Sequence, residues 1–179
     1  MKKRIILIVV LSLIIILWIF GIYKLSSMNN KNSNGKSSNI ITVFIEDALD
    51  ITNKYGITNS HPNEVKLEKA SALLNTPLRK VMHAFVYFVL SFLIILMANI
   101  IFKNKRFVLS FIITVLLIIA LASLDEYHQI FVVGRTGQLK DVLIDSIGGI
   151  CGIIFYGTYY FIYKLGYKRG IKNEKEHNS

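Results

Sequence analysis

Residues 107–124 read FVLSFIITVLLIIALASL, an apolar run without a charged side chain. A helix needs roughly 20 mostly apolar residues to cross about 30 Å of hydrocarbon, so this run predicts a membrane-spanning helix. Three further apolar runs qualify in the same way, at residues 5–23, at 81–102 with His83 as an ionisable interruption, and at 142–163 with Asp145 near its start. The sequence therefore predicts an all-α fold, a polytopic membrane protein in which residues 1–179 form a single domain around a four-transmembrane-helix bundle.

The composition agrees with a membrane protein and argues against a soluble domain. Hydrophobic residues make up 53% of the chain and charged residues only 18%, whereas soluble domains carry about 25% charged residues. The formal net charge of +10 would suit nucleic-acid binding in a soluble protein, but in a membrane protein such an excess more often sets topology. The single cysteine, Cys151, excludes an internal disulfide and any multi-cysteine metal site.

Lysine and arginine side chains gather at three places beside the apolar runs. The clusters are Lys2, Lys3 and Arg4; Lys103, Lys105 and Arg106; and Lys164, Lys168, Arg169, Lys172 and Lys175. If the four spans alternate in direction, all three clusters lie on the same side of the membrane, and the positive-inside rule makes that side cytoplasmic. We therefore expect a multi-pass plasma-membrane protein with both termini cytoplasmic and a cytoplasmic tail at 164–179. Because topology accounts for the charge, we expect no nucleic acid as a partner.

The long segment at residues 24–78 should then face the extracytoplasmic side. It opens with a polar, low-complexity linker at 26–38. Apolar residues recur at three- and four-residue spacings over 40–55 and again over 63–74, which predicts two amphipathic helices, and Pro77 is expected to close the loop before the second span. We expect both helices to pack on the outer membrane surface or over the bundle; a substrate-gating lid is the alternative.

The informative side chains are the polar ones at the outer ends of the last three spans, since a charge at mid-bilayer costs about 2.5–3.5 kcal/mol on insertion scales. They are Arg79, Lys80 and His83; Asp125, Glu126, His128 and Gln129; Arg135; and Asp141 and Asp145. This concentration on one side favours a functional site. The alternative is that each polar group only meets the membrane interface or caps a helix.

Spacing within the spans predicts that these groups converge. If the third span stays helical, Asp125 and Gln129 share a face because they are four residues apart. In the fourth span, Asp145 lies above glycines at 148–152, which let another helix approach closely. Arg135 lies in a glycine-flanked connecting turn, which we expect to fold its side chain back over the carboxylates.

Three stretches carry a resemblance. Residues 125–135 read DEYHQIFVVGR, residues 141–148 read DVLIDSIG and residues 80–87 read KVMHAFVY. They resemble the D-E-x-x-Q-x-F-x-x-x-R, D-x-x-x-N-x-x-G and K-x-x-H-x-x-x-Y motifs of the VanZ-like family. Ser26-Ser27 resembles the S-S-Q element of that family, and the resemblance extends from about Ile5 to Tyr163. Two departures are Met28 in place of the glutamine and Asp145 in place of the asparagine.

The resemblance implies a protein of the bacterial cell envelope that is accessory to glycopeptide resistance, in particular to teicoplanin. Our first hypothesis is a binder of a lipid or cell-wall precursor headgroup at the outer leaflet, so that the expected partners are a membrane lipid and such a precursor. Arg135 would clamp a phosphate, while Asp125, Gln129 and Asp145 would hold amine or hydroxyl groups.

Two other functions stay open. A membrane-embedded enzyme acting on such a headgroup would use His83 or Glu126 as the general base, with Asp141 orienting the histidine and Arg135 stabilising an oxyanion. A proton-linked transporter would relay protons through the buried carboxylates, and four spans would then need a second copy, a homodimer.

The polar residues at these span ends also include possible metal ligands. His83, His128 and a carboxylate are ligand types that suit zinc. The chain has no H-E-x-x-H motif, however, and the family pattern does not include His128. The sequence therefore leads us to expect no metal and no cofactor.

Overall fold

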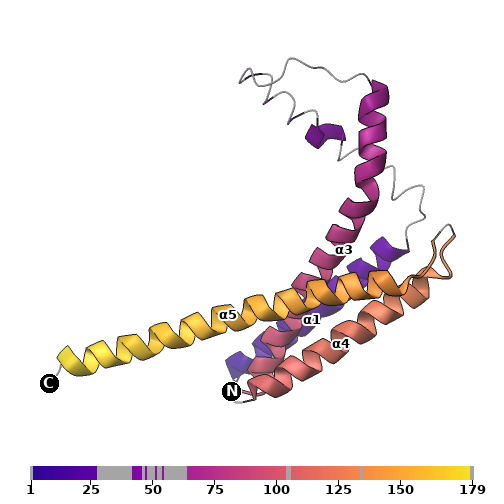
Figure 1. The fold of residues 1–179 in the computed structure, drawn as a ribbon. Helices are drawn as coiled ribbons and strands as arrows, with labels where there is room; N and C mark the ends of the chain where they lie inside the picture. Colours follow the sequence, from indigo (N-terminus) through magenta and orange to yellow (C-terminus); the bar gives the residue numbers. More distant parts are fainter. Residues whose placement is uncertain are drawn as a thin grey trace.

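The computed structural model describes residues 2–27, 42–45, 47, 51, 54, 64–103, 106–133 and 135–177. Its long helices are α1 (Lys2–Ser26), α3 (Glu64–Ile101), α4 (Phe107–Gln129) and α5 (Leu139–His177), and Figure 1 shows how they lie against one another. The described residues contain no strand. Each of the four helices is long and apolar enough to cross a membrane. The predicted all-α fold with four membrane helices is therefore confirmed.

The helices alternate in direction, as contacts at both ends of the bundle show. At one end, the guanidinium of Arg4 donates from Nε to the carbonyl oxygen of Ile100 (3.0 Å), and the rings of Phe107 and Tyr160 stack with centroids 5.9 Å apart. At the other end, Ser27 Oγ lies 3.0 Å from His128 Nε2. The flanks of the three basic clusters therefore share one end of the bundle, and the predicted polar groups lie at the other.

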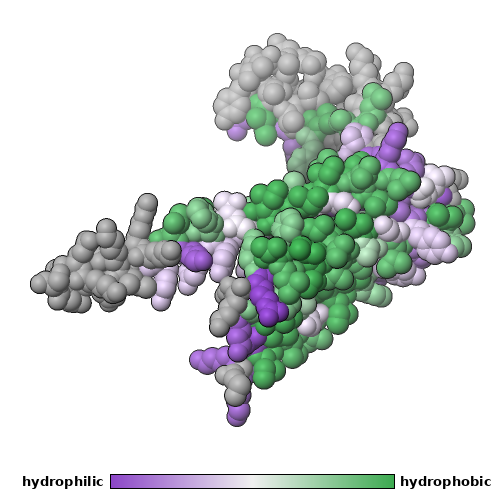
Figure 2. Space-filling model, turned by 60° about the horizontal axis from the view of Figure 1, so that its bottom comes forward, coloured by the Kyte–Doolittle hydropathy of each residue, from purple (hydrophilic) through white to green (hydrophobic). Residues whose placement is uncertain are grey.

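The outer faces of the helices are apolar. Figure 2 shows a broad hydrophobic surface over the bundle, with hydrophilic groups gathered toward its edges. Large side chains such as Leu17, Phe20 and Leu116 are more than half exposed on this surface. A soluble protein rarely exposes apolar patches of this extent, whereas lipid tails cover them at no cost.

The core between α1, α3 and α4 is built from residues at helical spacings. Its buried members are Ile15, Ile22, Tyr87, Leu90, Ile94, Ile118 and Ala122. A second cluster of Ile95, Ile153 and Tyr156 joins α3 to α5. The two clusters fix α3 at the centre of the bundle, where it contacts all three other helices.

Glycines let α5 approach α3 closely. A Cβ atom at Gly148 would collide with the backbone of Ala84, and one at Gly152 would collide with the backbone of Phe88. Gly149 faces the side chain of Ile118 in α4. The glycine strip expected from the sequence therefore sets the position of the α5 segment that carries Asp145.

We expect Gly148→Ala to lower the free energy of unfolding by about 1–3 kcal/mol, because the added methyl group forces α5 away from α3. Gly21→Ala is the matched control, since nothing lies within 4 Å of a Cβ atom at that spanning position. Thermal unfolding of both variants in one detergent measures the difference. Equal midpoints for the two variants would contradict the close α3–α5 contact.

Helix α3 differs from the prediction. Residues 64–74 are helical, but they do not form a separate amphipathic helix, since α3 runs without a break through Pro77 into the second span. The expectation that Pro77 closes the loop is therefore wrong. Proline removes one backbone donor and bends a helix, and membrane helices tolerate this where neighbouring groups satisfy the freed carbonyl. Figure 1 shows α3 bending along its length.

The ends of other helices also differ from the predicted ones. Helix α4 continues to Gln129, so its polar residues are helical as the spacing argument required, and α5 begins at Leu139, so Asp141 lies in its first turn and does not cap it. Of the predicted helix at 40–55, residues 42–45, 47, 51 and 54 are helical, and the rest lies outside the described residues, as does the linker from 28 to 38.

Candidate functional site

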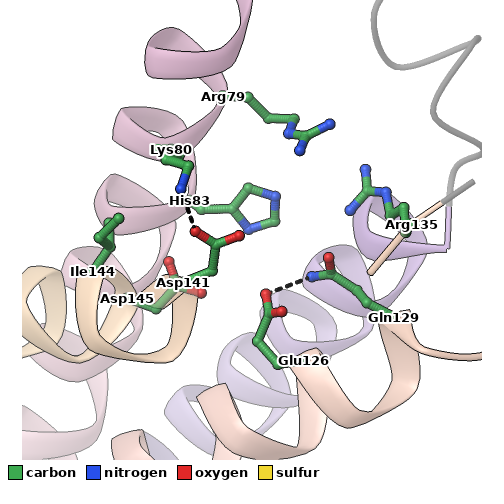
Figure 3. Close-up of a pocket in the computed structure, with 9 residues that line it drawn as sticks. All are labelled: Arg79, Lys80, His83, Glu126, Gln129, Arg135, Asp141, Ile144 and Asp145. Carbon is green, nitrogen blue, oxygen red and sulfur yellow. Dashed lines mark hydrogen bonds and ion pairs between the residues drawn. The ribbon is translucent and has the colours of Figure 1, made fainter. Parts of the chain in front are cut away.

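A polar pocket lies where α3, α4 and α5 meet the turn between α4 and α5. Its lining residues are Arg79, Lys80, His83, Glu126, Gln129, Arg135, Asp141, Ile144 and Asp145 (Figure 3). Six of the seven predicted site residues are in this lining, and the seventh, Asp125, is bonded to one of them. The structure thus brings together side chains from three helices, the outermost of which, Arg79 and Asp145, are 66 positions apart in the sequence.

The end of α4 supplies a buried polar cluster. Asp125, Glu126 and Gln129 are at most 8% exposed. The side-chain amide of Gln129 donates from Nε2 to Asp125 Oδ2 (3.1 Å) and to Glu126 Oε1 (3.0 Å). These bonds join residues three and four positions apart, which are neighbours on a helix surface. The face predicted for Asp125 and Gln129 therefore forms.

Glu126 also holds the turn that follows α4. Its second carboxylate oxygen, Oε2, accepts a hydrogen bond of 2.9 Å from the backbone N–H of Gln138. The turn passes so close to α4 that a Cβ atom at Gly137 would lie 2.5 Å from the carbonyl oxygen of Glu126. Both oxygens of Glu126 are therefore engaged within the protein, which suits an anchoring role.

Two arginines face each other across the mouth of the pocket. In Figure 3 the guanidinium groups of Arg79 from α3 and Arg135 from the turn point toward one another. The Nε atom of Arg135 is buried and has no hydrogen-bond partner among the described residues. Burial lowers the pKa of the Arg135 guanidinium, and the positive charge of Arg79 lowers it further. Two guanidinium groups in this arrangement form a binding place for an anion such as phosphate.

Lys80 pairs with the first turn of α5. Its Nζ atom lies 2.6 Å from Asp141 Oδ1, across the α3–α5 contact. Arg79 and Lys80 were named with the polar groups of the second span but given no role in the site, although they stand four and three positions before His83 and so share its side of the helix. That spacing is the signal that could have given them a role.

His83, Asp125 and Asp145 converge from three helices. Each offers one ligand atom, and these atoms all lie within 4.8 Å of one another, so these are the residues that could hold a metal ion. His128 does not join them. It lies against α1, with its ring 4.5 Å from the ring of Tyr23. A zinc site that uses both His83 and His128, the alternative considered from the sequence, is therefore wrong.

Two cavities differ in size and character. The polar pocket encloses about 20 Å³, which is room for about one water molecule or one small ion. An apolar cavity of about 260 Å³ lies between α1, α3 and α4. Its lining residues are Ile19, Ile22, Tyr23, Tyr87, Leu90, Leu121, Leu124, Asp125 and His128. Asp125 lines the apolar cavity and is bonded to Gln129 of the polar pocket, so the two cavities are neighbours.

Comparison with protein families matches residues 5–162 to the VanZ/LLP1 family. The chain belongs to this family. A comparison with curated proteins found no match, and a comparison with solved structures found none. The match covers all four spanning segments and the polar pocket of this VanZ/LLP1 protein.

The geometry gives the motifs of this VanZ/LLP1 protein a physical meaning. The residues of the D-E-x-x-Q stretch bond to one another and to the turn, and Arg135 completes the pocket mouth. Ser27, from the serine pair after the first span, contacts His128 at the same end of the bundle. Met28, which departs from the pattern, lies outside the described residues, whereas Asp145 is fully buried in the site.

Proposed function

We propose that this VanZ/LLP1 protein binds the headgroup of a membrane lipid, or of a lipid-linked cell-wall precursor, at the outer leaflet of the bacterial plasma membrane. We further propose that this binding contributes to glycopeptide resistance, including resistance to teicoplanin. The observation that carries the proposal is the neighbouring position of a charged pocket and an apolar cavity, because a ligand with a polar head and an apolar tail requires both.

The charged pocket suits a headgroup that bears a phosphate. Arg79 and Arg135 would bind the phosphate oxygens at the mouth, because the interior holds only about 20 Å³. Asp145 and Gln129 lie deeper and would accept or donate hydrogen bonds to an amine or a hydroxyl. The headgroup would therefore lie across the mouth, with its phosphate against the two arginines.

The apolar cavity suits part of an acyl or prenyl chain. Apart from Asp125 and His128, its lining consists of aliphatic and tyrosine side chains from three helices. Because the tail of a membrane lipid enters the cavity from the bilayer and not from water, van der Waals packing would hold it there. Asp125 marks the point where the head and the tail of the ligand would meet.

An enzyme acting on the same headgroup is the second candidate. The observation that favours it is the position of His83 beside Asp125 and Asp145, since a carboxylate next to a histidine orients the ring as a general base. Glu126 suits that role less well, because its two oxygens already accept hydrogen bonds. Proton-linked transport by a homodimer stays a prediction from the sequence.

Mass spectrometry of lipids and muropeptides tests the proposal. Cells that express the wild type are compared with cells that express Arg135→Ala, and lipids that copurify with each protein are extracted. A lipid bound to the wild type and lost from the variant, with no new product in the cells, supports binding. A modified lipid or muropeptide that depends on His83 would favour the enzyme, and the absence of any retained lipid would contradict the proposal.

The proposed orientation places both termini in the cytoplasm. Cys151 is exposed on the outer face of α5, so cysteine labelling needs a Cys151→Ser background. In that background we expect a membrane-impermeant maleimide to label Ser33→Cys in intact cells, and Lys103→Cys only after permeabilisation. The positive-inside rule is the reason, since Lys103 lies in a basic turn between two spans. The reverse pattern of labelling would contradict the orientation.

A further inference from the structure

His83, Asp125 and Asp145 form a compact group beside the polar pocket; His83 and Asp145 line that pocket, and Asp125 is bonded to Gln129, which lines it too. They come from α3, α4 and α5, and one ligand atom of each lies within 4.8 Å of the others. The sequence led us to expect no metal, because no motif places these three residues together. Only the packing of α5 on α3 through Gly148 and Gly152 brings Asp145 to His83.

The buried carboxylate of Asp145 has one oxygen without a hydrogen-bond partner among the described residues. Its side chain is 1% exposed, and its Oδ2 atom has no hydrogen-bond partner among the described residues. A buried carboxylate is strongly unfavourable unless a charge or hydrogen bonds compensate it. Lys80, which also lines the pocket, is 2.6 Å from Asp141 and pairs with that residue. The structure therefore leaves a buried acceptor atom of Asp145, a member of this group, without a partner among the described residues.

The other carboxylates of the pocket are already engaged. Glu126 accepts from Gln129 and from the backbone of Gln138, and Asp141 pairs with Lys80. Among the described residues, Asp125 accepts from Gln129 through Oδ2 alone, so its other oxygen, Oδ1, remains as a ligand atom. Two buried carboxylates, of which only Asp125 is tied to the network through Gln129, thus lie beside one imidazole.

We propose that His83, Asp125 and Asp145 bind a single divalent cation of the zinc and manganese class. An imidazole nitrogen with two carboxylate oxygens is a donor set that such ions accept, and two positive charges balance the two carboxylates. The polar pocket, with room for about one water molecule, also has the size of one small ion. This inference goes beyond headgroup binding and does not depend on it.

Gln129 has the position of a supporting residue for this site. Its amide fixes one oxygen of Asp125 by a hydrogen bond of 3.1 Å, which would leave the other oxygen directed at the cation. Such contacts orient metal ligands, and their loss typically weakens metal binding about 10–100-fold. Three protein ligands leave a coordination position open, and His83 and Asp145 line the same pocket as Arg79 and Arg135.

Metal titration of the full-length protein tests the inference. The protein is purified in detergent, its affinity tag is removed, chelator is dialysed away, and Zn²⁺, Mn²⁺, Mg²⁺ and Ca²⁺ are titrated by calorimetry with metal analysis after gel filtration. We expect one equivalent of Zn²⁺ or Mn²⁺ in the wild type. His83→Gln and Asp145→Asn should each weaken that binding at least about tenfold. His128→Gln is the matched control, since this histidine belongs to the same end of the bundle but contacts Ser27 and Tyr23.

Three results would overturn the inference. The first is a wild type that retains neither Zn²⁺ nor Mn²⁺, which would mean that a proton compensates the carboxylates. The second is an equal loss of binding in His83→Gln and His128→Gln. The third is binding of Mg²⁺ or Ca²⁺ that His83→Gln leaves unchanged. Two separate ligand variants are needed because Asp145 is fully buried, and if Asp145→Asn misfolds, His83→Gln, whose side chain is only half-buried, decides the question.

Discussion

Replacing Arg135 by alanine is expected to weaken the binding of a phosphate-bearing lipid to this VanZ/LLP1 protein by about 10- to 150-fold. A hydrogen bond to a charged group contributes about 1.5–3 kcal/mol, and about 1.4 kcal/mol corresponds to a factor of ten in affinity. The buried Nε atom of Arg135 has no partner among the described residues, so the loss should fall on the ligand and leave the fold nearly intact. Lipid binding to protein in nanodiscs, followed by native mass spectrometry, measures the effect.

Two further variants separate the charge of Arg135 from its shape and from general electrostatics. Arg135→Lys keeps the positive charge but loses the planar fork, so its affinity should lie between those of the wild type and Arg135→Ala. Lys140→Ala removes an exposed charge five residues away that does not line the pocket, and it should bind lipid as the wild type does. If Lys140→Ala loses as much affinity as Arg135→Ala, the arginine acts only through the net charge of the surface.

The parts of this protein that the sequence predicted well are those that depend on local chemistry. Helix α4 follows from an apolar run, because lipid requires every backbone group to be satisfied within the helix. The contact between Gln129 and Asp125 follows from a spacing of four residues, which needs no knowledge of the rest of the fold. The glycines of α5 likewise predict a close contact with another helix, although the sequence does not say that this helix is α3.

The parts that the sequence did not predict depend on how separate helices pack. Pro77 was expected to end the loop, but the bundle carries α3 through it, since proline in a membrane helix bends the chain more often than it stops it. The group of His83 and Asp145 joins residues 62 positions apart, and nothing in either local sequence shows that contact. Tertiary packing, not periodicity, therefore decides which carboxylates are paired and which are free to bind a ligand.

Glu126 shows why this distinction matters for function. The sequence made it, together with His83, a candidate general base of a membrane-embedded enzyme. In the structure its Oε1 atom accepts from Gln129 and its Oε2 atom accepts from the backbone of Gln138, so that it ties α4 to the start of α5. A carboxylate engaged in this way acts on the site by positioning Arg135 and Asp141, which stand on either side of Gln138.

Glu126→Ala is therefore expected to lower the free energy of unfolding by about 1.5–3 kcal/mol for each of the two hydrogen bonds that it removes. Part of this loss is offset because one of several neighbouring negative charges disappears. We therefore expect about 1.5 kcal/mol for each bond, or about 3 kcal/mol for the two bonds together. Thermal unfolding gives the total effect. Hydrogen exchange gives its location, since the backbone N–H of Gln138 should exchange faster while amides in the middle of α4 keep their protection.

Glu126→Gln distinguishes an anchoring role of Glu126 from a catalytic one. Glutamine keeps an oxygen that can accept the hydrogen bond from the backbone of Gln138, but a glutamine side chain cannot act as a general base. If Glu126 is an anchor, Glu126→Gln should keep most of the lipid affinity and most of the protection of the Gln138 backbone N–H against hydrogen exchange. The free energy of unfolding should fall only slightly, because the amide of Gln129 would then meet a second amide in place of a carboxylate. If Glu126 is the base of an enzyme, any product found in cells should vanish in Glu126→Gln while the protein remains as stable as the wild type. The two bonds to its oxygens favour the first outcome, which would leave His83 as the candidate base of the alternative, an enzyme.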